Sequence, residues 1–212
     1  AHLADFEIEE NDTLRVQPCL SPVWDTAIAM AALEEAGLQA DHPMLIKSAT
    51  WLIHNQILGA GDWQVKNQNL EPGGWAFEFR NDFYPDIDDT AFVLMALRRV
   101  AHPHTRWVDQ AVSRGRQWLL GMQNRDGGWG AFDRDNDHAA LTQVPFADHN
   151  AMIDPSTADV TARVLECLGR LGWTASRPAV ERGVEFLKRE QTPEGAWYGR
   201  WGVNYVYGTS GV

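Results

Sequence analysis

Apolar residues recur at helical spacing in six stretches of the chain, and short segments rich in Gly, Pro and Asp separate these stretches. The pattern predicts helices at about 22–36, 44–57, 88–101, 106–123, 157–171 and 178–191. The stretch 91–97 is apolar at every position, which is typical of a helix buried on two sides. The stretch 106–123 instead gathers its apolar residues on one face, as an outer helix would; these are Trp107, Val108, Ala111, Val112, Trp118, Leu119 and Met122. Alternating inner and outer helices predict an all-α fold of three stacked hairpins that form part of an α/α toroid.

A repeated segment follows each predicted outer helix. It contains an aromatic residue, a Gln five positions later and then a Gly-x-Trp sequence, and its three copies start 67 and 68 residues apart. Such self-similarity at a fixed period is the signature of a repeat architecture. We expect each Gln side chain to bond to backbone groups at a helix end that the Trp covers, which would join neighbouring hairpins. The tryptophans assigned to this role are Trp51, Trp63, Trp118, Trp129 and Trp197.

A second repeat opens the predicted inner helices. Its copies are Trp24-Asp25-Thr26-Ala27, Asp88-Asp89-Thr90-Ala91 and Asp159-Val160-Thr161-Ala162. Asp and Thr suit the first turn of a helix because their side-chain oxygens accept hydrogen bonds from its free N–H groups. Residues 207–212 lie where a fourth inner helix would begin.

Composition narrows the classes of function. The chain has 212 residues, of which 44% are hydrophobic, and a formal net charge of -11. These values exclude intrinsic disorder and argue against nucleic-acid binding, which needs clustered Lys and Arg. Two cysteines are too few for a disulfide scaffold. Because the chain lacks an initiator Met and ends just after a Gly/Ser turn, we expect residues 1–212 to form one incomplete α/α-barrel domain cut from a larger protein.

The densest chemistry lies at Asp86, Asp88 and Asp89, ahead of the all-apolar helix. Like charges raise one another's pKa, so one of three crowded carboxyl groups can stay protonated and act as an acid. One or two aspartates could merely cap the helix, but three exceed what a cap requires. A Mg²⁺ site is the alternative, although no phosphate-binding loop or basic cluster accompanies it.

Other chemical signals are weaker. Asp159 and Arg163 stand four residues apart on one predicted helix, where a local ion pair and a role in a site are equally compatible with the spacing. Residues 133–137 resemble the start of a calcium loop, but His138 replaces the required Gly. His54 and His149 have no companions at metal-ligand spacing. We therefore expect no metal site.

Together, the Gln…Gly-x-Trp repeats and Asp86-Ile-Asp88-Asp89-Thr90-Ala91 resemble the squalene–hopene cyclases, which are class II triterpene cyclases. The resemblance covers essentially the whole chain. It implies a protein about three times this length with two α-barrel domains, of which this chain would be the first part of the catalytic barrel. It also implies an isomerase that cyclises squalene to hopene and hopanol without metal or cofactor. Its expected partners are squalene and the rest of the same polypeptide, and its expected location is the cytoplasmic face of the cell membrane, bound peripherally.

The resemblance also implies roles for individual residues. Asp88 corresponds to the acid that protonates the terminal alkene, with Asp86 and Asp89 holding and polarising it. The aromatic rings whose π faces would stabilise carbocations correspond to Trp24, Phe77, Trp201 and Phe132. The residues that correspond to the family's supports for the acid site are Asp159, Arg163 and Tyr207.

Three positions depart from the family pattern. Arg163 stands where a His is familiar, Phe132 where a Tyr is familiar, and His149 where an aromatic hydrocarbon ring is familiar. A guanidinium cannot release a proton to the acid, but it can stabilise the carboxylate that Asp88 leaves. His149 beside a cation would be unfavourable if protonated.

Three other readings compete with a cyclase. An α/α-toroid glycoside hydrolase also uses paired carboxyl groups and Trp platforms. A protein prenyltransferase subunit shares the toroid, but its zinc ligands are missing from the sequence. A non-enzymatic helical-repeat scaffold would leave the three aspartates without a purpose.

Overall fold

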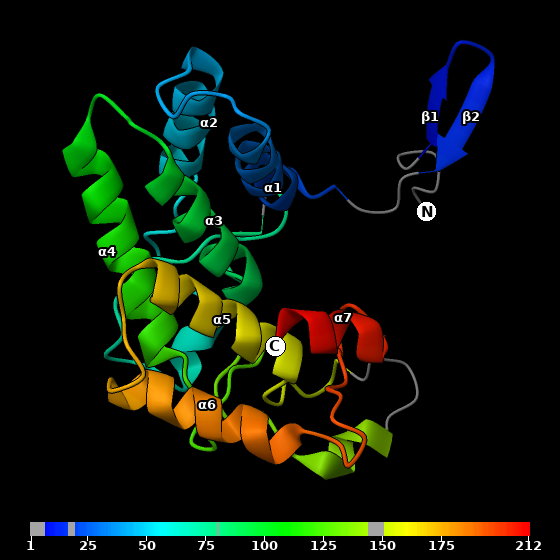
Figure 1. Cartoon of the computed structure of the whole chain (residues 1–212). Coiled ribbons are helices and arrows are strands. Elements are labelled where there is room, and N and C mark those ends of the chain that lie inside the picture. The colour runs from blue at the N-terminus through cyan, green and yellow to red at the C-terminus, as the bar shows by residue number, and fades with distance from the viewer. Residues whose placement is uncertain (1–6, 17–19, 80, 144–150) are drawn as a thin grey trace.

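The computed structural model describes residues 7–16, 20–79, 81–143 and 151–212. Its described part contains a short hairpin of two strands followed by seven α-helices and two 3-10 helices (Figure 1). In chain order these are β1 (Glu7–Glu10), β2 (Thr13–Val16), α1 (Pro22–Glu35), α2 (Pro43–His54), η2 (Asp62–Val65), α3 (Ile87–Arg99), α4 (Thr105–Gly121), η3 (Ala139–Gln143), α5 (Ala158–Arg170), α6 (Pro178–Glu190) and α7 (Tyr205–Gly211). Within the described ranges, no helix has the length and apolar character needed to cross a bilayer.

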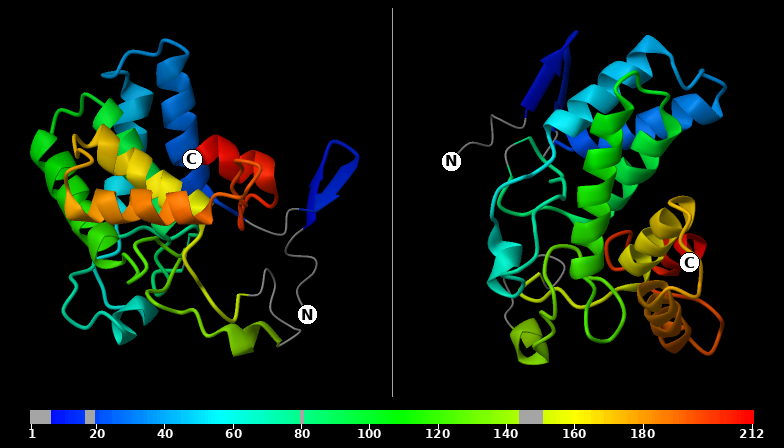
Figure 2. Two further views of the ribbon diagram at one scale, coloured as in Figure 1. Left: turned by 60° about the horizontal axis from the view of Figure 1, so that its bottom comes forward. Right: turned by 90° about the vertical axis from the view of Figure 1, so that its left-hand side faces the viewer.

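The helices form an inner row and an outer row, as the sequence predicts. In the inner row α1 contacts α3, α3 contacts α5, and α5 contacts α7. The outer helices α2, α4 and α6 each pack on the inner helix that precedes them (Figures 1 and 2). The all-α, partial α/α toroid is therefore confirmed, and α7 begins a fourth inner helix where it was expected.

The helix boundaries follow from local chemistry. Helices α1, α2 and α6 begin with Pro, whose fixed φ suits the first position and whose missing N–H has no helical partner to lose. Helix α3 is buried nearly all round, which confirms the prediction for 91–97. Helix α4 buries its predicted face, but the prediction is wrong for Trp107. Its side chain is 45% exposed and stacks on His104, with ring centroids 4.3 Å apart.

The repeated Gln joins neighbouring hairpins, as predicted, at two of its three positions. Gln56 Nε2 donates to the carbonyl oxygens of Gly73 and Ala111 at 2.8 and 2.9 Å. Gln123 Nε2 makes the same pair of bonds, to Gly127 and Ala179, both at 2.8 Å. Because Gln56 and Gln123 each bond to their own loop and to the next outer helix, they tie neighbouring hairpins together.

The assignment of the repeat tryptophans needs a correction. Trp129 and Trp197 each donate from Nε1 to the last turn of the preceding outer helix, at 2.7 Å. In the first hairpin this bond comes from Trp75, whose Nε1 donates to Leu52 at 2.6 Å. The loop there is longer than in the other copies, so the nearer Trp63 matches the spacing but not the position.

The remaining tryptophans of the predicted set have packing roles. Trp63 is buried edge-on against Trp118, with centroids 6.1 Å apart. Trp51 lies within α2 and packs edge-on against Phe79. The tryptophans that bond to the helix ends are therefore Trp75, Trp129 and Trp197.

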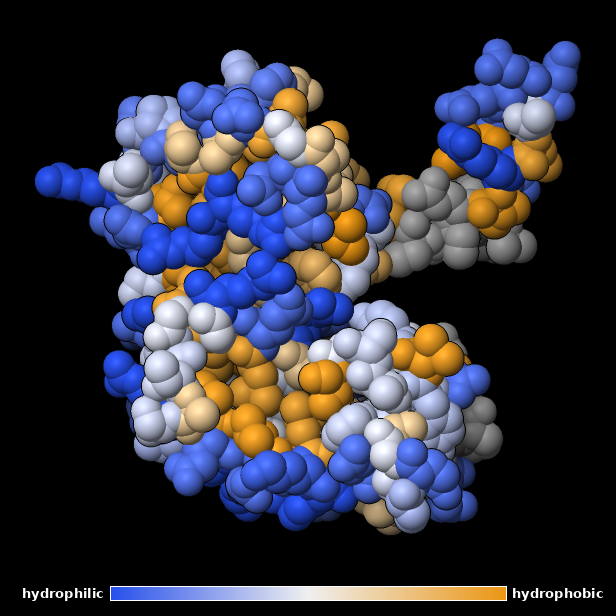
Figure 3. All heavy atoms as spheres, in the orientation of Figure 1, coloured by the Kyte–Doolittle hydropathy of each residue, from blue (hydrophilic) through white to orange (hydrophobic). Residues whose placement is uncertain are grey.

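The β-hairpin was not predicted. Its turn residues Asn11 and Asp12 both have positive φ, at 50° and 61°, which favours a tight two-residue hairpin turn. The hairpin stands apart from the helices in Figures 1 and 2. On the helical part, Figure 3 shows hydrophobic side chains gathered on the face between α5 and α6.

Candidate active site

Four of the predicted site residues occupy the same position of the repeat. The Oγ1 atoms of Thr90, Thr161 and Thr209 accept the N–H of Trp75, Trp129 and Trp197, at 2.9–3.0 Å. These threonines therefore have equivalent places on successive inner helices. Two residues before them stand Asp88, Asp159 and Tyr207, and Trp24 stands two residues before Thr26. Because neighbouring inner helices pack against one another, the side chains at this position converge.

Asp86 is the residue that caps α3. Its Oδ1 accepts the N–H of Asp89 at 3.0 Å, and its own N–H donates to the carbonyl of Trp75 at 2.7 Å. The cap therefore leaves the carboxyl groups of Asp88 and Asp89 available for another role. Burial and the nearby Asp88 raise the pKa of Asp86 above 3.8, and the backbone donors offset only part of that rise.

Asp89 is the most deeply buried of the three carboxyl groups, at 2% exposure. Within the described part of the chain its Oδ1 has no hydrogen-bond partner. Burial raises the pKa of Asp89, and the charges of Asp86, Asp88 and Asp25 raise it further. Burial and the neighbouring negative charges both favour protonated Asp89, so Asp89 can donate a hydrogen bond to a neighbouring carboxylate.

Asp88 is less buried, with 17% of its side chain exposed. Burial raises the pKa of Asp88 from 3.8 to about 6. The guanidinium of Arg163 lowers it by a smaller amount, and Asp159 raises it again. This carboxyl group therefore has an accessible side, a raised pKa and a cationic neighbour that can stabilise its ionised form.

Arg163 joins three elements at the site. Its Nε donates to Asp88 Oδ1 at 3.2 Å, and its guanidinium interacts with the Tyr207 side chain on α7. Its Cζ lies 4.0 Å from the ring centroid of Phe92. Of the two alternatives for Arg163, the structure shows contact with the acid site, and the ion pairs of Arg163 among the described residues are with Asp88 and Glu166 rather than with Asp159. Asp159 Oδ2 instead accepts the N–H of Trp201 at 2.8 Å.

Two of the predicted aromatic residues, Trp24 and Trp201, contact residues of this cluster or their neighbours. Trp24 packs edge-on against Phe92, with centroids 4.6 Å apart. Trp201 packs edge-on against Phe132 at 5.8 Å. Phe77 is half-buried two residues beyond Trp75, whose carbonyl binds the backbone of Asp86. Trp24 is therefore linked to the acid cluster through Phe92, which lies against Arg163. Trp201 is linked to it through the bond of its N–H to Asp159.

Asp154 was not predicted from the sequence. Its carboxylate accepts the N–H groups of Ala131, Phe132 and Asp133 at 3.0, 2.6 and 2.8 Å. The carbonyl of Ala131 in turn accepts the N–H of Ile87 at 2.8 Å, beside the acid cluster. Burial raises the pKa of Asp154 against the effect of these three donors. Asp154 therefore holds the loop that carries Phe132 against the start of α3.

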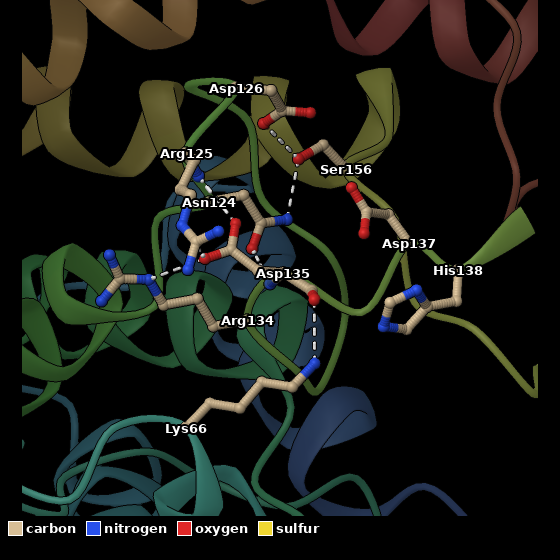
Figure 4. Close-up of a pocket in the computed structure, with 9 residues that line it drawn as sticks. All are labelled: Lys66, Asn124, Arg125, Asp126, Arg134, Asp135, Asp137, His138 and Ser156. Atoms are coloured by element: carbon tan, nitrogen blue, oxygen red, sulfur yellow. Dashed lines mark hydrogen bonds and ion pairs between the residues drawn. The ribbon is translucent and has the colours of Figure 1, made fainter.

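A polar hollow of about 660 Å³ contains none of the predicted site residues. At its centre the carbonyl of Asp135 accepts from Lys66 Nζ at 2.8 Å, and its carboxylate pairs with Arg125 (Figure 4). Its remaining lining residues are Asn124, Asp126, Arg134, Asp137, His138 and Ser156. The charged groups at its centre therefore pair with one another. Of the other residues singled out in the sequence, His149 lies outside the described ranges.

Comparisons with known proteins place the chain in a family. The family model "Squalene-hopene cyclase C-terminal domain" matches residues 20–212. Over 196 residues the chain is 50% identical to a squalene–hopene cyclase of Alicyclobacillus acidocaldarius. The matched region covers 92% of this chain and 31% of that protein. It is 49% identical to a dammaradiene synthase of Dryopteris crassirhizoma (98% and 32% covered) and 48% identical to a squalene–hopene cyclase of Bradyrhizobium diazoefficiens (95% and 31%). The chain spans about a third of the length of these relatives. It belongs to the squalene–hopene cyclase C-terminal domain family.

Proposed function

We propose that this chain supplies the proton-donating part of a triterpene cyclase, with squalene as substrate and hopene or hopanol as product. The observation that carries the proposal is Asp88, which has a pKa raised to about 6 and lies 3.2 Å from Arg163. Family membership supports terpene cyclisation, because squalene–hopene cyclases and a dammaradiene synthase are among the relatives. The glycoside hydrolase, prenyltransferase and scaffold alternatives gain no support from these relatives.

In the proposed reaction Asp88 transfers its proton to the less substituted carbon of the terminal double bond. The π electrons form the new C–H bond and leave a cation on the neighbouring tertiary carbon. The other double bonds then attack in turn and close the rings. The last cation loses a proton to give hopene, or it takes up water, which then loses a proton to give hopanol.

The surrounding residues have complementary roles in this proposal. Arg163 stabilises the carboxylate that Asp88 leaves, through its Nε–H. Protonated Asp86 and Asp89 polarise the acid. The rings of Trp24, Phe77, Phe132 and Trp201 stabilise the cations, each by up to about 2 kcal/mol when water is excluded. The resemblance assigns Asp159 and Tyr207 to the support of Asp88 and Arg163.

We further propose that the active unit extends beyond these 212 residues and works as an isomerase at one face of a membrane. The relatives are about three times as long, and squalene is a hydrocarbon that dissolves in the bilayer interior. Water reaching the acid would quench a cation, so the remainder of the polypeptide is needed to close the site.

The decisive experiment replaces Asp88 by Asn in the full-length polypeptide that carries this chain. Squalene is supplied in phospholipid vesicles, and products are identified by gas chromatography. Loss of the acid should lower turnover at least about 100-fold. Asp82→Asn is the matched control, because Asp82 is exposed in the loop just before α3 and its replacement should leave turnover unchanged. Turnover that survives in Asp88→Asn would overturn the acid role, and failure to sediment with the vesicles would overturn the membrane proposal.

A further inference from the structure

The guanidinium of Arg163 is held from two sides along α5. Its Nε donates to Asp88, while one of its terminal nitrogens donates to Glu166 Oε2 at 3.1 Å. The other carboxylate oxygen of Glu166 accepts from Arg170 Nε at 3.0 Å. Alternating charges therefore run along one face of α5, from the acid toward the far end of the helix.

This arrangement fixes the orientation of the guanidinium. The ring of Phe92 lies beneath it, so the planar group can rotate only within that stack. The bond to Glu166 selects the rotation that turns Nε toward Asp88. Without Glu166, another N–H of Arg163 could face the acid or the group could turn toward solvent.

The charges that face Asp88 come from every helix packed around it. Asp86 and Asp89 on α3 and Asp159 and Glu166 on α5 are acidic, and Asp25 on α1 faces Asp89. Tyr207 approaches from α7, and Arg163 contributes a positive charge. A cation beside an acid favours loss of its proton, whereas Glu166 favours its retention. Glu166 thus offsets part of the effect of Arg163.

We propose that Glu166 is a positioning residue for the acid, which aims Arg163 at Asp88 and balances the guanidinium charge. This inference rests on the proposed function of Asp88. The alternative is that Glu166 and Arg163 form an ordinary surface pair along a helix, which contributes only slightly to stability. The two readings differ in what they predict for the dependence of turnover on pH.

The test measures squalene turnover against pH in the full-length polypeptide. Turnover requires protonated Asp88 and therefore falls as the pH rises through the pKa of this group. Glu166→Gln removes a negative charge near the acid, so this fall should move to lower pH by about half a unit. Glu166→Asp keeps the charge, so the pH at which turnover falls should lie closer to that of the unmodified protein. Glu185→Gln on α6 is the matched control, because it also removes an i,i+3 pair, with Lys188, and should leave the profile unchanged.

A variant at Arg170 gives a second test of opposite sign. Arg170 neutralises Glu166 from the outer side, with half of its side chain exposed. Arg170→Gln should therefore strengthen the field of Glu166 and move the fall in turnover to higher pH. This test stands even if Glu166→Gln fails to fold. An unmoved profile in Arg170→Gln, or in a folded Glu166→Gln, would overturn the proposal.

A double variant asks whether Glu166 acts through Arg163. In an Arg163→Gln background, Glu166→Gln should shift the profile by less than it does alone. Equal shifts in both backgrounds would contradict positioning through Arg163. If the Asp88→Asn enzyme keeps its turnover, the proposed function itself fails. If Asp88→Asn is inactive but the pH profile does not change in Glu166→Gln, only the role of Glu166 is refuted.

Discussion

Three neighbouring carboxyl groups in this protein have three different environments. Asp86 accepts a backbone N–H, Asp89 is enclosed without a partner for Oδ1 among the described residues, and Asp88 faces a guanidinium. Burial raises the pKa of all three. A raised pKa in the folded state means that these groups favour folding most at low pH. That contribution is lost as the pH rises through the raised values.

The sequence predicts most of the acid site, but not the contacts that hold it. Clustered aspartates and an Arg at the start of an inner helix are visible as residue types, and the structure brings Asp88 and Arg163 together. Spacing alone left a pair between Asp159 and Arg163 and a role in the site equally open, because it cannot show which way a long side chain turns. Asp154 gave no signal, since its partners are backbone N–H groups of a distant loop.

The role of Asp154 can be tested by Asp154→Asn. The amide replaces one acceptor oxygen by a donor, so at least one buried N–H of residues 131–133 loses its partner. We expect the free energy of unfolding to fall by about 1–3 kcal/mol, measured by urea denaturation. Asp133→Asn is the control, because the Asp133 side chain accepts a single bond, from Asn136, and should cost less. Equal losses in the two variants would contradict a special role for Asp154.

At the scale of elements, the helices were predictable and the loops were not. The predicted ranges agree with the observed helices to within three residues. The largest difference is at α2, which ends at His54 because Gln56 leaves the helix to bond to Gly73 and Ala111. Trp75 was missed because the extra residues of the first loop moved it away from its Gln. Only the fold shows that Trp75 and Trp129 make equivalent bonds.

The repeated Gln should stabilise the stack only where it bonds to a following hairpin. Gln123 is buried and bonds to Gly127, Ala179 and Arg182, so Gln123→Ala should lower the free energy of unfolding by about 2–4 kcal/mol. Gln191 has the same repeat position but is exposed and bonds within its own loop, to Gly195 at 3.1 Å. Gln191→Ala should therefore cost less than about 1 kcal/mol. Equal shifts of the urea midpoint in this pair would show that the bond to the next outer helix contributes little.

At the scale of the whole molecule, the site depends on the stacking of hairpins. Asp88 belongs to α3, Arg163 to α5 and Tyr207 to α7, so no single hairpin contains the acid and its supporting groups. The repeat solves this by placing equivalent positions of successive inner helices side by side. Architecture and chemistry therefore share one sequence signal, and the loss of stacking would remove both.

The same stacking leaves an apolar edge, which we expect to drive self-association of the 212-residue chain. Hydrophobic side chains gather on the face between α5 and α6 (Figure 3), and Val206 on α7 is 84% exposed. The net charge of -11 repels copies, so association should increase when salt screens that charge. Light scattering should show masses above 23.8 kDa that grow with concentration and with salt. Val206→Lys should weaken this association, whereas Val65→Lys, at an exposed site on η2, should not. A monomer under all these conditions would contradict the expectation.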